Sequence, residues 1–173
     1  MSGAETRGDA CGSTRPAVRI TSGTSSATFA WAGDRWRHVV AVADGSRLES
    51  VEGPAATGGD PRWPASPVFT EVSLVDVGGR AAILGVGLAG RSHFSVSVAA
   101  HPDLPDTLLF EIACRIHEPP GPLGSTYAAA DGTVARIEPA AAPTPPCTVQ
   151  WTYAVGPAGL APLSVPAVQP RRP

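Results

Sequence analysis

Short stretches in which apolar and polar residues alternate fill the middle of the chain. Between residues 17 and 155 these stretches are rich in Val, Ile, Thr, Phe and Trp, and Gly or Pro interrupts them at short intervals. Alternation with a period of two, bounded by turn residues, is typical of half-buried β-strands. No window of eleven residues combines the helical period of about 3.6 residues with good helix formers. The pattern therefore predicts an all-β fold, a single antiparallel β-sandwich over residues 17–155.

The two ends of the chain differ from this middle region. Residues 1–16 are small, polar and rich in Gly, which predicts a disordered N-terminus. Residues 156–173 are rich in Pro and end in QPRRP, which predicts an extended or disordered tail. The length of 173 residues fits one domain with flexible ends.

The sequence around Gly33-Asp34 predicts a β-hairpin with a two-residue turn. Glycine at the first position of the turn suits type II′, and the pairing that follows sets Phe29 opposite His38 and Trp31 opposite Trp36. Alternation then gives one face an apolar and aromatic set of side chains: Phe29, Trp31, Trp36, His38 and Val40. We expect this face to belong to the core, because buried aromatic side chains dominate core energetics. An exposed aromatic platform for a sugar ring is the alternative.

A second hairpin is predicted around Gly78-Gly79, between residues 68–77 and 80–88. The pairing gives both of its faces apolar side chains: Val72, Leu74 and Ile83 on one face, and Val75, Val77, Leu84 and Val86 on the other. A strand pair that is apolar on both sides is typical of the middle of a layered structure. Gly85 and Gly87 leave a strip of one face without side chains, so we expect an aromatic ring or a ligand to pack closely there.

Residues 85–90, with the sequence GVGLAG, match the G-x-G-x-x-G pattern of dinucleotide-binding sites. That pattern indicates a dinucleotide-binding site only where it joins a strand to a helix inside a βαβ unit. Here the segment SHFSVSV follows it, which alternates like a strand. We therefore assign no nucleotide site to these glycines.

The strands expected at 92–99 and 106–118 carry a set of polar residues that could bind a ligand. If the two strands pair through the loop between them, four side chains share one sheet face: His93, Glu111, Arg115 and His117. Glu111 and Arg115 lie ~13 Å apart along their strand, at about 3.3 Å per residue, so they cannot pair with each other. An acid, a base and a cation on one face could bind or isomerise a polyol. The alternative is a solvated outer face with cross-strand charge pairs. We take the four as candidate ligand-binding residues and assign no catalytic residue.

The Pro- and Gly-rich segment 118–127 is a second place for a ligand. Loops on rigid scaffolds often carry binding residues, and Tyr127 and Trp63 could stack on a sugar ring there. A connector between two sheets is the commoner role for such a loop.

Composition and short sequence patterns restrict the classes of partner that this protein could bind and the cellular compartment in which we expect it. The net charge is −2 and the chain contains no Lys, which argues against a nucleic-acid partner. No stretch approaches the ~18 apolar residues of a membrane span, and the N-terminus lacks the basic and apolar regions of a secretory signal. Cys11, Cys114 and Cys147 lack the spacing of zinc or redox motifs. We therefore expect a cytoplasmic protein with free thiols and with neither metal nor other cofactor, and we expect Cys114 to fill the core.

From Ser92 to Tyr127 the chain resembles the middle strands of galactose-mutarotase-like sandwich domains, in particular through the segment SHFSVSVAAHPDLPDTLLFEIACRI. The similarity covers about a fifth of the chain. It implies a β-sandwich of sugar-binding ancestry, because that family binds sugars on a concave sheet face and uses a His and a Glu for epimerisation. The family's Asn-His element is absent, since the chain contains no Asn, so no catalytic residue is carried over.

The sequence leaves three functions open. The first is a non-catalytic binding or interaction module for a carbohydrate or a protein partner, and this is the function we favour. The second is a small epimerase-like sugar isomerase that uses His93 or His117 with Glu111. The third is a structural or assembly domain.

Overall fold

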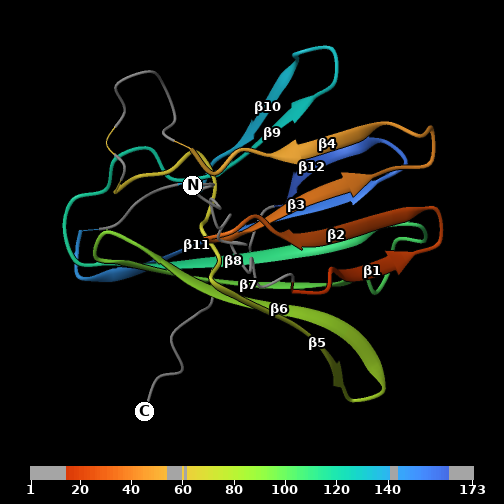
Figure 1. The fold of residues 1–173 in the computed structure, drawn as a ribbon, viewed down its shortest axis with the longest axis horizontal. Coiled ribbons are helices and arrows are strands. Elements are labelled where there is room, and N and C mark those ends of the chain that lie inside the picture. The colour runs from red at the N-terminus through yellow and green to blue at the C-terminus, as the bar shows by residue number, and fades with distance from the viewer. Residues whose placement is uncertain (1–14, 54–59, 61, 141–143, 164–173) are drawn as a thin grey trace, which may run out of the picture.

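The computed structural model describes residues 15–53, 60, 62–140 and 144–163, and within them the chain forms twelve β-strands and no helix (Figure 1). The first sheet has the strand order β1-β2-β3-β4-β9-β10. Its strands are β1 (Val18–Ser22), β2 (Ser25–Trp31), β3 (Trp36–Ala41), β4 (Arg47–Ser50), β9 (Ser125–Ala129) and β10 (Val134–Ile137). The second sheet has the order β12-β11-β8-β7-β6-β5. Its strands are β5 (Glu71–Val77), β6 (Arg80–Ala89), β7 (Ser92–Ala100), β8 (Leu108–Ile116), β11 (Cys147–Gly156) and β12 (Gly159–Leu163).

The core lies between the two sheets, which confirms the predicted antiparallel sandwich. Along β7 and β8 buried residues alternate with more exposed ones, as a sheet with one covered face requires. Both sheets contribute fully buried large side chains, among them Phe29 and Tyr127 from the first and Ile83, Phe110 and Tyr153 from the second. Cys114 is also fully buried on this face and fills the core as predicted.

The hairpin of β2 and β3 has the register and the orientation that the sequence predicts. Phe29 lies opposite His38 and Trp31 opposite Trp36, and Ala32 N donates to Arg35 O across the turn at 2.8 Å. Phe29, Trp36, His38 and Val40 are buried, and Trp31 is half-buried against the core. The aromatic face therefore belongs to the core, and the alternative of an exposed aromatic platform is wrong.

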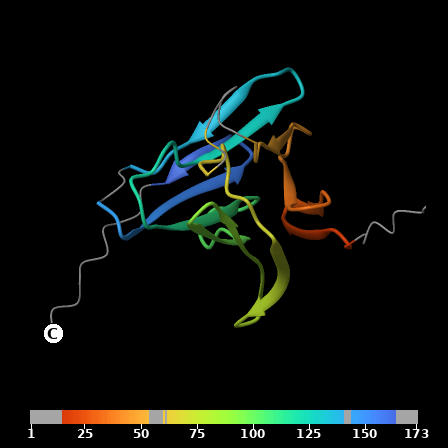
Figure 2. The ribbon, with the colours of Figure 1, turned by 60° about the vertical axis from the view of Figure 1, so that its left-hand side comes forward.

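The hairpin of β5 and β6 has the predicted register but not the predicted burial. Leu74 lies opposite Ile83, and Ile83 is fully buried. Three apolar residues on the other face of β6 are exposed, however: Leu84, Val86 and Leu88. The prediction that both faces are buried is wrong, because β5 is the edge strand and nothing in the described part of the chain covers the outer face of β6. Figure 2 shows this hairpin reaching away from the rest of the sandwich.

The strip left by Gly87 is filled by the backbone of another segment, and not by an aromatic ring or a ligand. A Cβ atom at position 87 would lie 2.0 Å from the carbonyl oxygen of Val68 and 2.8 Å from the Cα atom of Phe69. This segment, residues 68–70, joins the two sheets. Phe69 O accepts a hydrogen bond from Trp36 N of the first sheet at 2.8 Å, and Thr70 N donates to Val86 O of the second sheet at 2.9 Å. Only glycine permits so close a crossing.

Replacing Gly87 with Ala is expected to lower the free energy of unfolding by about 2–3 kcal/mol, because the added methyl group would overlap backbone atoms that cannot move independently. Urea unfolding followed by tryptophan fluorescence measures the loss. Gly53→Ala is the matched control, since Gly53 is exposed and a Cβ there meets nothing within 4 Å; its effect should stay within about 0.5 kcal/mol. Equal effects at the two positions would contradict the close crossing.

The sandwich extends beyond the boundary that composition indicated. Composition predicts a tail over residues 156–173, yet β12 pairs with the end of β11, with Val155 opposite Leu160. The sequence of β12 is GLAPL, and the strand lies at an exposed edge of its sheet. It therefore lacks the alternation of apolar and polar residues from which the other strands are predicted. Residues 1–14 of the predicted disordered N-terminus, the rest of the tail and Cys11 lie outside the described residues.

Candidate functional site

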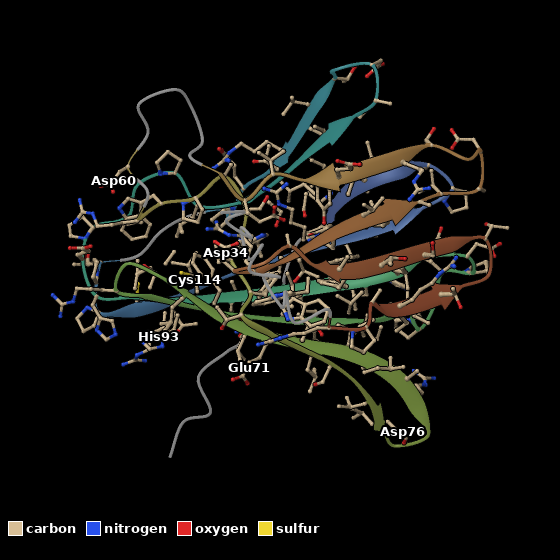
Figure 3. All side chains as sticks on the ribbon, in the orientation of Figure 1. Asp34, Asp60, Glu71, Asp76, His93 and Cys114 are labelled. Carbon is tan, nitrogen blue, oxygen red and sulfur yellow. The ribbon has the colours of Figure 1, made fainter. Side chains whose placement is uncertain are left out.

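The four candidate ligand-binding residues lie on the second sheet, and all of them are exposed. His93 on β7 is directly opposite Arg115 on β8, and Glu111 is opposite Ser97. His117 follows the end of β8, and its ring centroid lies 6.4 Å from that of His93. The neighbours of these residues along each strand are buried, so His93, Glu111 and Arg115 face outward from the sandwich. Figure 3 shows His93 and Glu71 on the same side of the molecule.

Two shallow depressions on this outer face adjoin each other. The first, with a volume of about 460 Å³, is lined by His93 and Arg115 together with Glu71, Leu88 and Thr148. The second, of about 360 Å³, is lined by Glu111 together with Leu84, Ser97, Gln150 and Thr152. Val86, Ser95 and Ala113 border both depressions. We call the two depressions together the outer groove.

The strand register explains why the sheet is hollowed here. Ala113 of β8 lies opposite Ser95 of β7, and these two small side chains form the floor. On one side of the floor Gln150 of β11 is opposite Ala113, and on the other side Val86 of β6 is opposite Ser95. Larger side chains thus stand on both sides of a row of small ones.

The two walls of the outer groove differ in chemistry. The wall from β11 is polar and presents Thr148, Gln150 and Thr152. The wall from β6 is aliphatic and presents three side chains that are 41–52% exposed: Leu84, Val86 and Leu88. A groove of this kind offers hydrogen bonds along one side and apolar contact along the other.

The charged residues of the outer groove are available to a ligand. None of the ion pairs within the described part of the chain includes Glu71, His93, Glu111 or Arg115. Arg115 lines one depression and Glu111 the other, which agrees with their expected separation of ~13 Å along β8. The groove therefore carries a cation with five hydrogen-bond donors near one end and a carboxylate acceptor near the other.

Part of this site escaped sequence analysis. The sequence predicts that β5, which carries Glu71, pairs with β6, but it does not show that this hairpin lies beside β7. Nor does it show that β11, which carries Thr148, Gln150 and Thr152, lies beside β8. The signal for β11 was nonetheless present, because Thr148, Gln150 and Thr152 alternate with apolar residues in the segment TVQWTY. That alternation indicates a polar outer face but not that the face adjoins Glu111 and Arg115.

A second group of polar residues lies inside the core. Tyr127 Oη is 2.8 Å from His38 Nε2 and 2.6 Å from Tyr153 Oη, and all three side chains are buried. Burial lowers the pKa of His38 to about 3 and raises the pKa of both tyrosines. The three residues link strands of both sheets and line neither depression of the outer groove, so their role is structural.

Of the two roles considered for the segment 118–127, the one in which Tyr127 and Trp63 stack on a sugar ring is wrong. Tyr127 is fully buried in the hydrogen-bonded group, and Trp63 is 5% exposed. A Cβ atom at Gly121 would lie 2.7 Å from the Trp63 ring, which shows that the segment 118–127 packs directly onto this indole. The segment therefore acts here as a connector that covers the core.

None of the protein-family models, curated proteins and solved structures compared with this chain matches it. The resemblance to galactose-mutarotase-like domains therefore stays a prediction. The described residues contain no cluster of three or more His, Cys, Asp or Glu side chains placed to hold a metal ion. They also contain no helix that is long and apolar enough to cross a membrane.

Proposed function

We propose that this protein is a non-catalytic binding module that holds a carbohydrate in the outer groove. One observation carries the proposal: a polar wall and an aliphatic wall face each other across a floor of small residues, with Arg115 and Glu111 in the two halves. The sequence resemblance to a sugar-binding sandwich family supports the same function.

The chemistry of the outer groove suits a sugar chain. Sugar hydroxyls both donate and accept hydrogen bonds, and Gln150, Thr152 and Ser95 offer partners of both kinds. The C–H faces of sugar rings are apolar and can lie against Val86 and its neighbours on β6. Arg115 would donate through its planar guanidinium to hydroxyls or to a carboxylate, and Glu111 would accept from hydroxyls. The distance between these two residues exceeds one sugar ring, which favours an oligosaccharide.

The positions of the candidate acid and base favour binding over isomerisation. An acid–base catalyst must come within hydrogen-bond reach of the proton that it transfers. His93 is opposite Arg115, so it lies about four residues, or ~13 Å along the sheet, from the level of Glu111. His117 is farther still. The epimerase-like function that pairs either histidine with Glu111 therefore has no geometric support.

We also propose that this protein resides in the cytoplasm. Cys114 is a buried thiol that forms no disulfide, and burial raises its pKa to about 12, which keeps it protonated and unreactive. An inert core cysteine is compatible with the reducing cytoplasm that we expect for this protein.

A glycan array followed by isothermal titration of the best binders tests the function. We expect Arg115→Ala and Glu111→Gln each to weaken binding roughly tenfold or more, because each removes a charge-assisted hydrogen bond. The melting temperature should stay nearly unchanged, since an exposed charge contributes only ~0–1 kcal/mol to stability.

The first sheet supplies matched controls for both variants. Arg19→Ala on β1 and Glu49→Gln on β4 remove exposed charges of the same kinds from the first sheet, and they should leave binding unchanged. Absence of any glycan ligand for the unaltered protein, or equal binding by Arg115→Ala, would overturn the proposal. Sugar turnover that is lost in Glu111→Gln would instead support the epimerase-like function.

A further inference from the structure

The hairpin of β5 and β6 concentrates the exposed apolar surface of this protein. Seven large hydrophobic side chains are exposed among the described residues, and five of them belong to this hairpin: Leu74, Val77, Leu84, Val86 and Leu88. Leu74 and Val77 lie on β5 itself and are 52% and 59% exposed. The three on β6 form the aliphatic wall of the outer groove, whereas Leu74 and Val77 lie at the sheet edge itself. Exposed apolar residues on an edge strand indicate an interaction surface along that edge.

β5 is also an open edge of the second sheet, and it differs from the other three edge strands. An exposed edge offers unpaired backbone N–H and C=O groups, which proteins commonly block with basic residues, proline or short strands. Among the described edges, β1 carries Arg19, β12 carries Pro162, and β10 is only four residues long and carries Arg136. β5 has seven residues, without Pro, Lys or Arg, and pairs with β6 in an unbroken register.

We propose that β5 pairs with β5 of a second copy of this chain, in antiparallel orientation about a two-fold axis. An antiparallel edge is complementary to itself, so a two-fold dimer needs no chemistry that the strand lacks. With Leu74 on the axis, Leu74 meets its counterpart, and Ser73 lies opposite Val75 of the second copy. The exposed Leu74 side chains then cover each other.

The charges at the ends of β5 favour this register and this partner. Glu71 is set opposite Val77 of the second copy, and Val77 is paired with Arg80 within its own hairpin. Glu71 and Arg80 of the second copy then lie on the same sheet face, on either side of Val77 of the second copy. Their Cα atoms are about 9–10 Å apart, which corresponds to two strand spacings. Two extended side chains can span that distance. Neither Glu71 nor Arg80 makes an ion pair within the described part of the chain, and the two-fold axis forms the pair twice.

Asp76 does not oppose this arrangement. Its Oδ1 atom accepts a hydrogen bond from Gly79 N at 2.8 Å in the turn of its own hairpin. In the proposed register it lies opposite Val72 of the second copy and away from other acidic residues. The two second sheets would join into one continuous twelve-stranded sheet, with both outer grooves facing the same side.

Sedimentation velocity and light scattering of the full chain across a wide concentration range test the proposal. We expect a reversible dimer, and no larger species, because pairing about a two-fold axis uses the open edge of both copies. Leu74→Lys should weaken dimerisation at least about tenfold, since it places two like charges on the axis. Val134→Lys on β10 is the matched control, because Val134 is 61% exposed at a different edge, and this variant should dimerise like the unaltered protein.

A charge exchange tests the register. Glu71→Arg and Arg80→Glu should each weaken the dimer roughly tenfold, and the double variant should restore it, because only the double variant places opposite charges together again. Circular dichroism melting of every variant confirms that the monomer still folds. A protein that remains monomeric throughout, or a dimer weakened by Val134→Lys and not by Leu74→Lys, would overturn the proposed edge. Failure of the double variant to recover dimerisation would overturn the proposed register.

Discussion

Lowering the pH from about 6.5 to about 3 is expected to reduce the stability of the folded protein by about 4–5 kcal/mol through His38 alone. In the unfolded chain a histidine binds a proton below pH 6.5 or so, whereas burial in the core lowers the pKa of folded His38 to about 3. The unfolded state therefore binds the extra proton throughout this range, and stability falls as the pH falls. Each tenfold difference in proton affinity is worth about 1.4 kcal/mol. Below about pH 3 both states are protonated and His38 causes no further loss.

The structure explains why folded His38 stays neutral. Its ring lies between those of Phe29 and Phe110, with centroid distances of 4.7 and 5.9 Å. Nε2 lies 2.8 Å from the Tyr127 hydroxyl, but Nδ1 has no hydrogen-bond partner among the described residues. A protonated ring would place a charge in an apolar layer with one of its two N–H donors unpaired.

Urea unfolding at a series of pH values checks this expectation when the unaltered protein is compared with His38→Gln. The glutamine variant keeps a polar group near Tyr127 and has no proton to gain, so its stability should depend much less on pH between 6.5 and 3. Other groups titrate identically in the two proteins and cancel in the comparison. One of them is Glu52, whose pKa burial raises, so that it acts in the opposite sense above about pH 4.5. His38→Leu provides the same comparison if the Gln variant does not fold. Parallel pH profiles would contradict a buried neutral His38.

Replacing Trp36 with Ala is expected to lower the free energy of unfolding by about 3–5 kcal/mol, the usual loss for a large buried aromatic side chain. Trp36 is 4% exposed and belongs to the core. Its backbone N–H also donates the hydrogen bond to Phe69 O that holds the segment 68–70, which crosses Gly87 and joins the two sheets. A cavity at this position would therefore loosen the contact between the two sheets as well as the core.

Trp31→Ala is the matched comparison, because Trp31 lies opposite Trp36 and touches it edge to face at 5.8 Å. Trp31 is only half-buried, and its outer side is covered by the Arg15 guanidinium at 4.0 Å from the ring centroid. Its removal should cost about 1–2 kcal/mol, because less of its surface leaves water on folding. Chemical unfolding of both variants under one condition measures the difference. A loss at Trp36 no larger than that at Trp31 would contradict the burial described above.

The candidate site was partly predictable, because alternation along a strand fixes which side chains share a face. His93, Glu111 and Arg115 could be assigned to one face from β7 and β8 alone. The pairing of His93 with Arg115 could not be predicted from the sequence, because the loop between β7 and β8 has seven residues and does not fix a register. Gln150 and Glu71 join the site only because β11 lies beside β8 and because the hairpin of β5 and β6 lies beside β7.

By itself the sequence determined the all-β class of this protein and the local structure of two of its hairpins: their strands, their tight turns and the register across each turn. A two-residue turn at Gly33-Asp34 or Gly78-Gly79 leaves one pairing that keeps the apolar residues together, so both hairpins followed from the chain alone. Only the tertiary structure decided which apolar faces are covered. Leu84 and Val40 are equally apolar in sequence, yet Val40 faces the opposite sheet and Leu84 faces solvent. Burial depends on the layer that packs against a face, and that layer comes from residues distant in the chain.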